Sequence, residues 1–333
     1  MSGVRVDIHN HFYPGTYLRD LEERGQDVRI GTDVSGRRYI EEDGARLVTL
    51  TPPMIDLEQR FAMMDATGID IQIMSMTSPN VYAFRADDAV TVARMVNDEY
   101  ASLKDHHPDR LRCLASVPLG TGAEVEELDR AIQHLGLDGL IVGTNVHGKT
   151  LDDASFEPFW KRVDELALPV LLHPMSPMVG TRYLDRFAMV PLIGFPFDTT
   201  LAIMRLIWSG FLAKFPRVRL IASHTGGALA YLTGRFEIGF DAYDECRQIG
   251  VRPAEALRHI WYDTIGYHPP ALRCLADSVG VSQMVFGTDY PHVIGDAERV
   301  IASLEATGFS ADELEAIYYR NFVDGLGLGL PRS

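Results

Sequence analysis

Short apolar runs alternate along the chain with stretches of helical spacing, and this alternation constrains the fold more than any other feature. Apolar residues recur with the period of an amphipathic helix in stretches such as Leu57–Thr67 and Asp87–His107. Eight strand–helix repeats predict an α/β fold, a distorted (β/α)₈ TIM barrel. The eight runs are Val4–Ile8, Asp70–Ser75, Leu111–Val117, Gly139–Val142, Pro169–Leu172, Val218–Ala222, Ile260–Asp263 and Gln283–Phe286.

The chain is longer than the ~250 residues that such a barrel needs. Its 333 residues leave room for an insertion after the first strand, at 13–53, where glycine, proline and charges interrupt any sustained period. Loops that follow barrel strands lie on the catalytic face, so we expect this insertion to cap the active site. The tail from Ala311 to Leu330 predicts a C-terminal helical extension, with a helix over Glu313–Phe322.

No linker divides the chain, so residues 1–333 are predicted to form a single domain. A doubly wound parallel sheet is the alternative architecture. That fold usually carries a Gly-X-Gly-X-X-Gly turn after an early strand, and no such turn follows the early strands here.

Charge and composition exclude several classes of partner. The 31 Lys and Arg residues against 46 Asp and Glu give a net charge of −15, which disfavours nucleic acid. No uninterrupted apolar run approaches ~20 residues, and the N-terminus lacks a basic head before an apolar stretch, so we predict a cytoplasmic chain without a membrane partner. The three cysteines are far apart, so a metal would be held by histidines and carboxylates.

The first predicted strand ends in a His-X-His pattern. Side chains alternate between the two faces of a strand, so His9 and His11 point the same way. Two converging imidazoles can hold one divalent cation at ~2.0–2.1 Å per nitrogen. A polar loop with two hydrogen-bonded histidines is the alternative.

Ionisable residues also end three other predicted strands: His173 the fifth, His224 the sixth and Asp289 the eighth. The carboxyl ends of barrel strands surround one mouth, so these side chains should meet there. Taken singly, each has an ordinary explanation, such as a hydrogen-bonded strand end, a helix cap or an Asx turn. Their joint occurrence favours a metal site.

The motifs at these strand ends resemble the amidohydrolase superfamily, and within it the branch of aminocarboxymuconate semialdehyde decarboxylase. The resemblance extends over nearly the whole chain. It is carried by four segments, Asp7–Phe12, Leu172–Pro174, Ser223–Gly227 and Gly287–Pro291.

The resemblance implies one divalent metal ion, usually Zn²⁺ with Mn²⁺ as the alternative, and no organic cofactor. The implied ligands are His9, His11, His173 and Asp289. His224 is the implied catalytic acid or base, and Asp289 ligates the metal, shuttles a proton, or does both. A histidine that is free of the metal is suited to proton transfer near neutral pH.

Asn145 stands at the fourth strand end, where two-metal relatives place a bridging carbamylated lysine. Its presence favours the single-metal interpretation and makes Asn145 a candidate substrate contact. Nearby His147 is either a further substrate contact or an ordinary loop residue.

A carboxylate substrate needs cationic anchors. The family places one arginine in the insertion, for which Arg46 is the candidate here. It places another in the helix after the catalytic histidine, reaching across a homodimer interface, and Arg235 matches this position. For either arginine the alternative is a surface ion pair of little consequence. His292 stands where the decarboxylase has phenylalanine, so the pocket should be lined differently and His292 should contact substrate.

The first functional hypothesis is therefore a metal-dependent, cofactor-independent non-oxidative decarboxylase of a small aromatic or muconate-like carboxylic acid. The second keeps the same site but uses an activated water on a carbonyl, which makes the protein a lactone or amide hydrolase. The third is a metal-stabilised scaffold without enzymatic activity.

Overall fold

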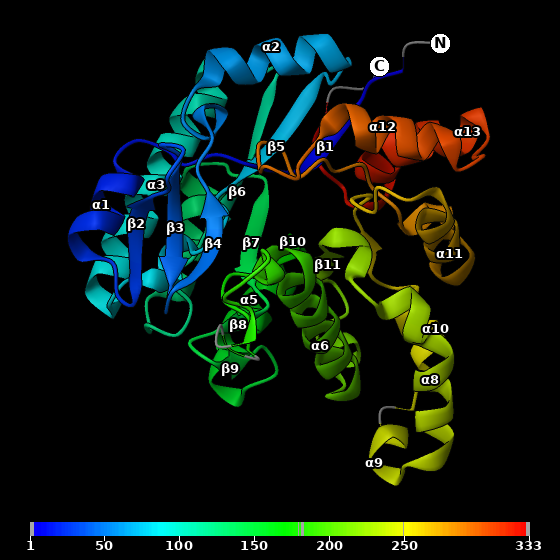
Figure 1. The fold of residues 1–333 in the computed structure, drawn as a ribbon. Helices are drawn as coiled ribbons and strands as arrows, with labels where there is room; N and C mark the ends of the chain where they lie inside the picture. Colours follow the sequence, from blue (N-terminus) through cyan, green and yellow to red (C-terminus); the bar gives the residue numbers. More distant parts are fainter. Residues whose placement is uncertain (1–2, 179, 181–182, 249, 331–333) are drawn as a thin grey trace.

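Seven parallel strands form one curled sheet in the computed structural model, which describes residues 3–178, 180, 183–248 and 250–330 (Figure 1). Nearly every residue of these strands is buried, because barrel strands are covered by side chains inside and by helices outside. Seven of the eight predicted runs are thus confirmed as strands. In sheet order they are β1 Val6–His11, β5 Ile71–Ser75, β6 Leu111–Ser116, β7 Gly139–Gly143, β10 Pro169–His173, β11 Arg219–Ala222 and β12 Trp261–Tyr262.

The eighth run, Gln283–Phe286, is not a regular strand, and that prediction is wrong in detail. Single bridges, Tyr262 to Met284 and Asn10 to Tyr290, connect this closing segment to β12 and β1. The absence of a side chain at Gly287 lets this segment lie close to β1, since a Cβ there would lie 2.8 Å from the Cβ of His9. The amide of Asp289 donates to the carbonyl of His9 at 2.7 Å, which connects the segment to β1.

The insertion after β1 is ordered, contrary to the expectation of an aperiodic loop. It contains α1 (Tyr17–Arg24) and an antiparallel sheet of β2 (Val28–Thr32), β3 (Arg38–Glu42) and β4 (Ala45–Thr49). Few of its positions are buried, so the period-two signal in the sequence is weak. Figure 1 shows this small sheet, in blue, beside the strand ends of the barrel.

Helices and short turns connect the strands and cover the barrel. Some begin at a side-chain cap: Asp56, for example, accepts from the amides of Glu58 and Gln59, and the helix that follows ends at Gly68 in the left-handed region. They are η1 Pro52–Met54, α2 Leu57–Thr67, η2 Asn80–Ala83, α3 Ala86–His106, α4 Glu124–Asp129, η3 Arg130–His134, η4 Ala154–Phe156, α5 Glu157–Leu166, η6 Val190–Gly194, α6 Phe195–Trp208, α7 Phe211–Lys214, η7 His224–Gly226, α8 Leu229–Ala242, α9 Asp244–Arg247, α10 Pro253–Leu257, α11 Pro269–Val279, η8 Val281–Gln283, α12 Ala297–Ala306, α13 Ala311–Glu315 and η9 Ala316–Gly325.

Two smaller features complete the architecture. A short hairpin of β8 (Asn145–Val146) and β9 (Lys149–Thr150) follows β7. The helical stretch Val190–Trp208 is long and apolar enough to cross a membrane by length and composition alone, with a mean hydropathy of 1.4. Because 61% of that window is buried in the fold, we interpret it as a core helix.

Candidate metal centre

Four histidines and one aspartate converge at the carboxyl ends of the barrel strands. The ring centroid of His9 lies 4.9 Å from that of His11, 5.0 Å from His173 and 5.1 Å from His224. Asp289 Oδ1 lies 3.4 Å from His9 Nε2 and 3.3 Å from His11 Nε2. The structure therefore brings together all five residues that the sequence predicted at this mouth.

Several atoms of this cluster are buried without a hydrogen-bond partner. They are both ring nitrogens of His173, Nδ1 of His224 and Oδ1 of Asp289. Buried polar atoms are almost always paired, so such a group indicates a missing ligand. Imidazole nitrogens and carboxylate oxygens are donors that Zn²⁺ accepts, and these residues therefore fit a divalent cation.

The donors form two overlapping groups, in each of which one ligand atom per residue lies within 4.8 Å of the others. One group contains His9, His173, His224 and Asp289, and the other contains His11, Asp289 and His292. Asp289 belongs to both groups, so its carboxylate lies at the centre of the cluster.

The surroundings of His11, His173 and Asp289 favour the protonation states in which these three residues bind a cation. Burial lowers the pKa of His11 to about 3 and lowers that of His173, where neighbouring His11 adds to the effect. Burial alone would raise the pKa of Asp289, but the surrounding histidines, His292 first, hold it below its usual range. Neutral imidazoles around an ionised carboxylate are the states in which these groups bind a cation.

Asp263 supports the cluster from behind, at the carboxyl end of β12. Its Oδ2 lies 2.5 Å from His9 Nδ1, so His9 donates there and Nε2 keeps a lone pair that can bind a cation. The same carboxylate accepts from the amides of His224 and Thr225, each at 2.8 Å. These bonds stabilise the positive φ angles of both residues, 54° and 55°. Sequence reasoning missed Asp263, although it ends the seventh predicted strand at the same mouth.

A second buried network lies beneath β1. Asp7 accepts from Gln72 Nε2 at 2.9 Å and from Thr288 Oγ1 at 2.8 Å, and burial raises its pKa to about 6. Arg60 is fully buried, donates to Gln72 Oε1 at 2.8 Å and also bonds the carbonyl of His11. These contacts tie β1 to β5 and to the closing segment, which fixes the backbone that carries the histidines.

A cavity of about 240 Å³ opens onto the cluster. His173, His224, Asp289 and His292 form part of its lining, and His292 Nε2 lies 3.0 Å from Thr77 Oγ1. The insertion contributes four further lining residues, among them Arg46. The full lining is Arg37, Arg46, Leu47, Thr49, His173, Ala188, Pro191, Phe195, His224, Asp289, His292, Val293 and Ile294.

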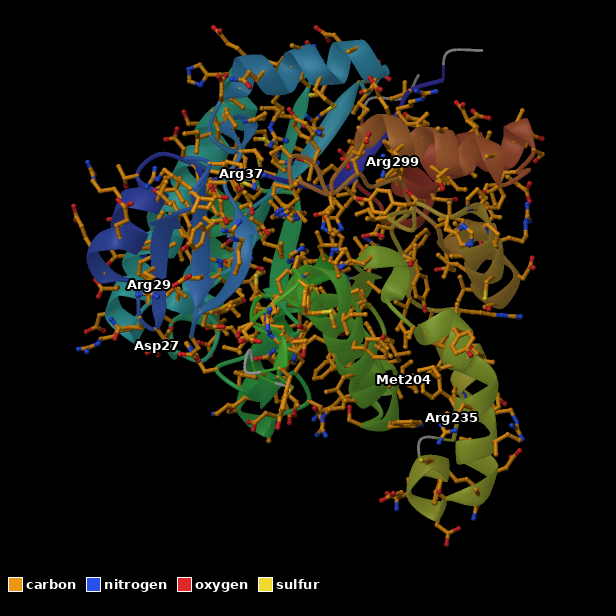
Figure 2. All side chains as sticks on the ribbon, in the orientation of Figure 1. Asp27, Arg29, Arg37, Met204, Arg235 and Arg299 are labelled. Carbon is orange, nitrogen blue, oxygen red and sulfur yellow. The ribbon has the colours of Figure 1, made fainter. Side chains whose placement is uncertain are left out.

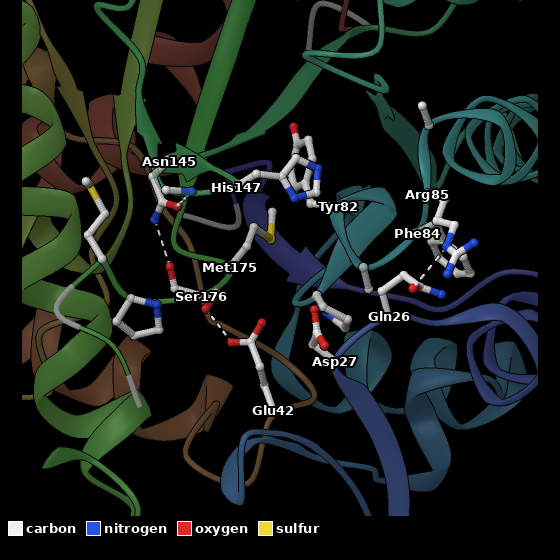
Figure 3. Close-up of a pocket in the computed structure, with 16 residues that line it drawn as sticks. Gln26, Asp27, Glu42, Tyr82, Phe84, Arg85, Asn145, His147, Met175 and Ser176 are labelled. Atoms are coloured by element: carbon white, nitrogen blue, oxygen red, sulfur yellow. Dashed lines mark hydrogen bonds between the residues drawn. The ribbon is translucent and has the colours of Figure 1, made fainter. Parts of the chain in front are cut away.

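Asn145 does not line this cavity, which differs from the expectation that it contacts substrate, and Arg235, which was expected to reach across to another copy, does not line it either. Asn145 Nδ2 donates to Asp198 Oδ2 at 3.0 Å, and Asn145 lines a separate cavity of about 580 Å³ together with Glu42 and His147 (Figure 3). The same amide nitrogen also donates to the carbonyl of Ser176 at 2.7 Å. Arg235 is exposed on α8, well away from the insertion that carries Arg46 (Figure 2).

Known proteins with similar sequences are decarboxylases. The 2-amino-3-carboxymuconate-6-semialdehyde decarboxylase of Dictyostelium discoideum is 30% identical over 334 residues, which cover 98% of this chain and 92% of the relative. The 6-methylsalicylic acid decarboxylase of Penicillium expansum is 29% identical over 303 residues, which cover 88% of this chain and 87% of the relative.

The fold is also that of a solved structure, a dihydroxybenzoic acid decarboxylase from Polaromonas sp. JS666 with bound manganese and the inhibitor 2-nitroresorcinol. The TM-score is 0.81 at 21% identity, and the match covers 99% of this chain and 98% of the other. Residues 6–321 match the amidohydrolase family model. Since that match spans nearly all of the sequence and includes every side chain of the cluster, the chain belongs to the amidohydrolase family.

Proposed function

We propose that this protein is a metal-dependent, cofactor-independent non-oxidative decarboxylase of a small aromatic or muconate-like carboxylic acid. The observation that carries the proposal is the cluster of buried, unpartnered histidine and aspartate atoms at the floor of a cavity that also contains arginine. The two decarboxylases that resemble the chain in sequence support the reaction class.

His9, His11, His173 and Asp289 would hold the cation. When bound, a divalent metal supplies a Lewis acid that polarises an oxygen of the substrate or of water. We propose Zn²⁺ as the native ion, with Mn²⁺ as the alternative, because histidine-rich sets with one carboxylate suit both.

His224 is proposed to move the proton. Its Nε2 lies 3.9 Å from Asp289 Oδ2, and its ring lines the cavity. Burial lowers the pKa of His224 to about 4, so the ring is mostly neutral near neutral pH and must first take up a proton from solvent before it donates it. Donation of a proton to the carbon that bears the carboxylate makes that carbon tetrahedral. The bond to the carboxylate then breaks, its electron pair returns to the unsaturated system, and CO₂ leaves, so a proton replaces the carboxyl group.

The experiment that tests this function compares the release of CO₂ with the formation of ring-opened acid. Purified, Zn²⁺-loaded protein is incubated with a panel of dihydroxybenzoates, muconates and lactones, and both CO₂ and ring-opened acid are measured. Release of CO₂ from an unsaturated acid is the expected result. Ring-opened acid without CO₂ would establish the lactone hydrolase instead, and neither product from any compound in the panel would contradict the proposed substrate class.

We also propose that two copies of the chain assemble. Exposed apolar side chains support this, with Phe197 and Leu201 on α6 and Tyr231 and Ile238 on α8 between 45% and 84% exposed. Such side chains usually mark an interface when they occur together. In this arrangement Arg235, which is exposed on the same helix α8, would reach the cavity of the other copy.

A further inference from the structure

We propose that the cavity between the insertion and the loops after β5, β7 and β10 is a second small-molecule site, and that it takes a free α-amino acid. Its volume is about 580 Å³, against about 240 Å³ for the cavity at the metal centre. None of the side chains of the metal cluster lines it. The site is therefore separate from the proposed decarboxylation, and the inference goes beyond that function.

The lining of this second cavity carries both signs of charge. Asp27 and Glu42 belong to the insertion, and Arg85 immediately precedes α3 (Figure 3). Within the part of the chain that the structure describes, neither Asp27 nor Arg85 takes part in an ion pair, and the carboxylate of Asp27 accepts no hydrogen bond. Opposite charges that line one cavity without pairing with each other suit a ligand that carries both charges itself.

Gln26 holds the two charged segments in place. Its amide donates to the carbonyl of Ala83 at 2.6 Å, and its Oε1 accepts from Arg85 Nε at 3.1 Å. These bonds fix the segment that carries Asp27 to the segment that carries Arg85. Because Gln26 bonds only Nε, the two terminal nitrogens of Arg85 stay free, and such a pair of donors matches the two oxygens of a carboxylate.

The acidic side of the cavity favours an ammonium group. The hydroxyl of Ser176, after β10, donates to one oxygen of Glu42. Burial raises the pKa of Glu42, and the negative charges of Asp43 and Asp27 add to the effect. A positive charge placed between Asp27 and Glu42 would offset that repulsion.

Side chains that can pack against an apolar group complete the wall. The rings of Tyr82 and His147 lie edge to face with centroids 6.5 Å apart, and Met175 lies near them in Figure 3. An α-amino acid presents an ammonium, a carboxylate and a side chain from one carbon atom, so it matches all three kinds of group. A simple amine would leave Arg85 without a partner, and a simple carboxylic acid would leave Asp27 without one.

The test measures binding and does not depend on turnover. Zn²⁺-loaded protein is titrated calorimetrically with each of the standard amino acids. At least one should bind with a Kd of about 1 mM or lower, which a few charge-assisted contacts can supply. The tightest ligand is then compared with its α-amide, which lacks the carboxylate, and with its N-acetyl form, which lacks the ammonium. Each analogue should bind about tenfold more weakly, the loss of one charge-assisted contact.

Two variants assign each charge of the ligand to its partner. Asp27→Asn should weaken binding of the free amino acid about tenfold and leave the N-acetyl form unchanged, because that form has no ammonium. Arg85→Gln should weaken the free amino acid by a similar factor and leave the α-amide unchanged. Both residues are exposed, so both variants should fold. A compound bound at the metal centre would be affected by neither substitution, since neither residue lines that cavity.

Asp43→Asn and Arg94→Gln are the matched controls. Asp43 adjoins Glu42, Arg94 lies on α3, and neither lines the second cavity, so both variants should retain the affinity of the wild type. The proposal is overturned if no amino acid binds with a Kd of about 1 mM or lower. It is also overturned if either analogue binds as tightly as the free amino acid, or if Asp27→Asn and Arg85→Gln leave the affinity unchanged. Equal losses in the control variants would overturn it too, because they would assign the effect to the overall charge of the surface.

Discussion

His9 and His11 on β1 each have a fixed orientation because a second residue contacts the ring nitrogen Nδ1. His9 donates to Asp263, and His11 Nδ1 lies 3.3 Å from Ser75 Oγ. Asp263 also holds the amide of His224, so one carboxylate positions both a proposed ligand and the proposed proton donor. The geometry of the site therefore depends on a residue that need not touch metal or substrate.

Asp263→Asn tests that dependence. The amide group that replaces the carboxylate binds His9 Nδ1 more weakly, so Zn²⁺ affinity should fall by about 10–100-fold. Competition with a chelator measures the change. Asp198→Asn is the control, because Asp198 is also buried but bonds Asn145 outside the metal centre. Equal loss of affinity in both variants would show that any buried aspartate matters only for folding.

His9→Ala and His224→Ala separate ligation from proton transfer. Removal of His9 deletes a proposed ligand, so most of the bound metal should be lost. Removal of His224 should leave the metal content near one ion per chain and lower turnover by about 10²–10⁴-fold. Elemental analysis and initial rates decide between the roles. Comparable metal loss in both variants would place His224 among the ligands, as the grouping of His224 with His9, His173 and Asp289 permits.

The meeting of these side chains at one mouth could be predicted from the sequence because strand alternation and strand ends are local properties. His9 and His11 share a face by periodicity, and His173 and Asp289 end apolar runs. Asp263 and Arg37 could not be found this way. The bond from Asp263 to His9 joins residues 254 positions apart, and only the turn before β3 decides that Arg37, rather than Arg38, lines the cavity.

At the scale of elements, the small sheet of the insertion is connected to the barrel by few polar contacts. One joins Ser176, after β10, to Glu42 at the end of β3. Burial raises the pKa of Glu42 above its usual value of 4.5. The folded protein therefore favours the protonated form of this carboxyl more than the unfolded chain does.

Glu42→Gln tests this contact through its pH dependence. The pKa of Glu42 is higher in the folded protein than in the unfolded chain, so its carboxyl ionises first in the unfolded chain. The free energy of unfolding therefore falls as pH increases above 4.5. Glutamine keeps the acceptor for Ser176 and cannot ionise. The melting temperature of Glu42→Gln should therefore be closest to that of the wild type at pH 4, exceed it increasingly as pH rises from 4.5 to the raised pKa of Glu42, and stay above it by a constant amount at higher pH. A difference that is independent of pH would contradict this account.

At the scale of the whole molecule, the proposed assembly brings Arg235 to the cavity of a second copy. Arg235 lies on α8, the same helix whose Tyr231 is 84% exposed. A single chain leaves both side chains in solvent. The oligomer, the single-domain organisation of residues 1–333 and the cytoplasmic location stay predictions from the sequence.

Mixing two inactive variants tests the assembly. Arg235→Gln and His224→Ala should each lower activity strongly when pure. If Arg235 acts across the interface, a mixed dimer contains one intact site, so an equimolar refolded mixture should recover about a quarter of the wild-type rate. Ultracentrifugation checks that dimers have formed. A mixture no more active than its components would show that Arg235 does not act in the other copy.

The barrel was predictable from the sequence because its strands are buried on both faces and read as apolar runs. The pairing of the closing segment with β1 was not predictable, because it depends on the absence of a Cβ at Gly287. The small sheet of the insertion was not predictable either, because its half-exposed strands give no clear period.

The closing of the barrel near Asp289 also has a consequence for biosynthesis. His9 is translated 280 residues before Asp289. Nascent chains start to fold before synthesis ends, yet this one cannot assemble its full donor set until Asp289 has been added. Metal loading should therefore wait for Asp289, and nascent chains truncated before that residue should exchange the ion readily with added chelators.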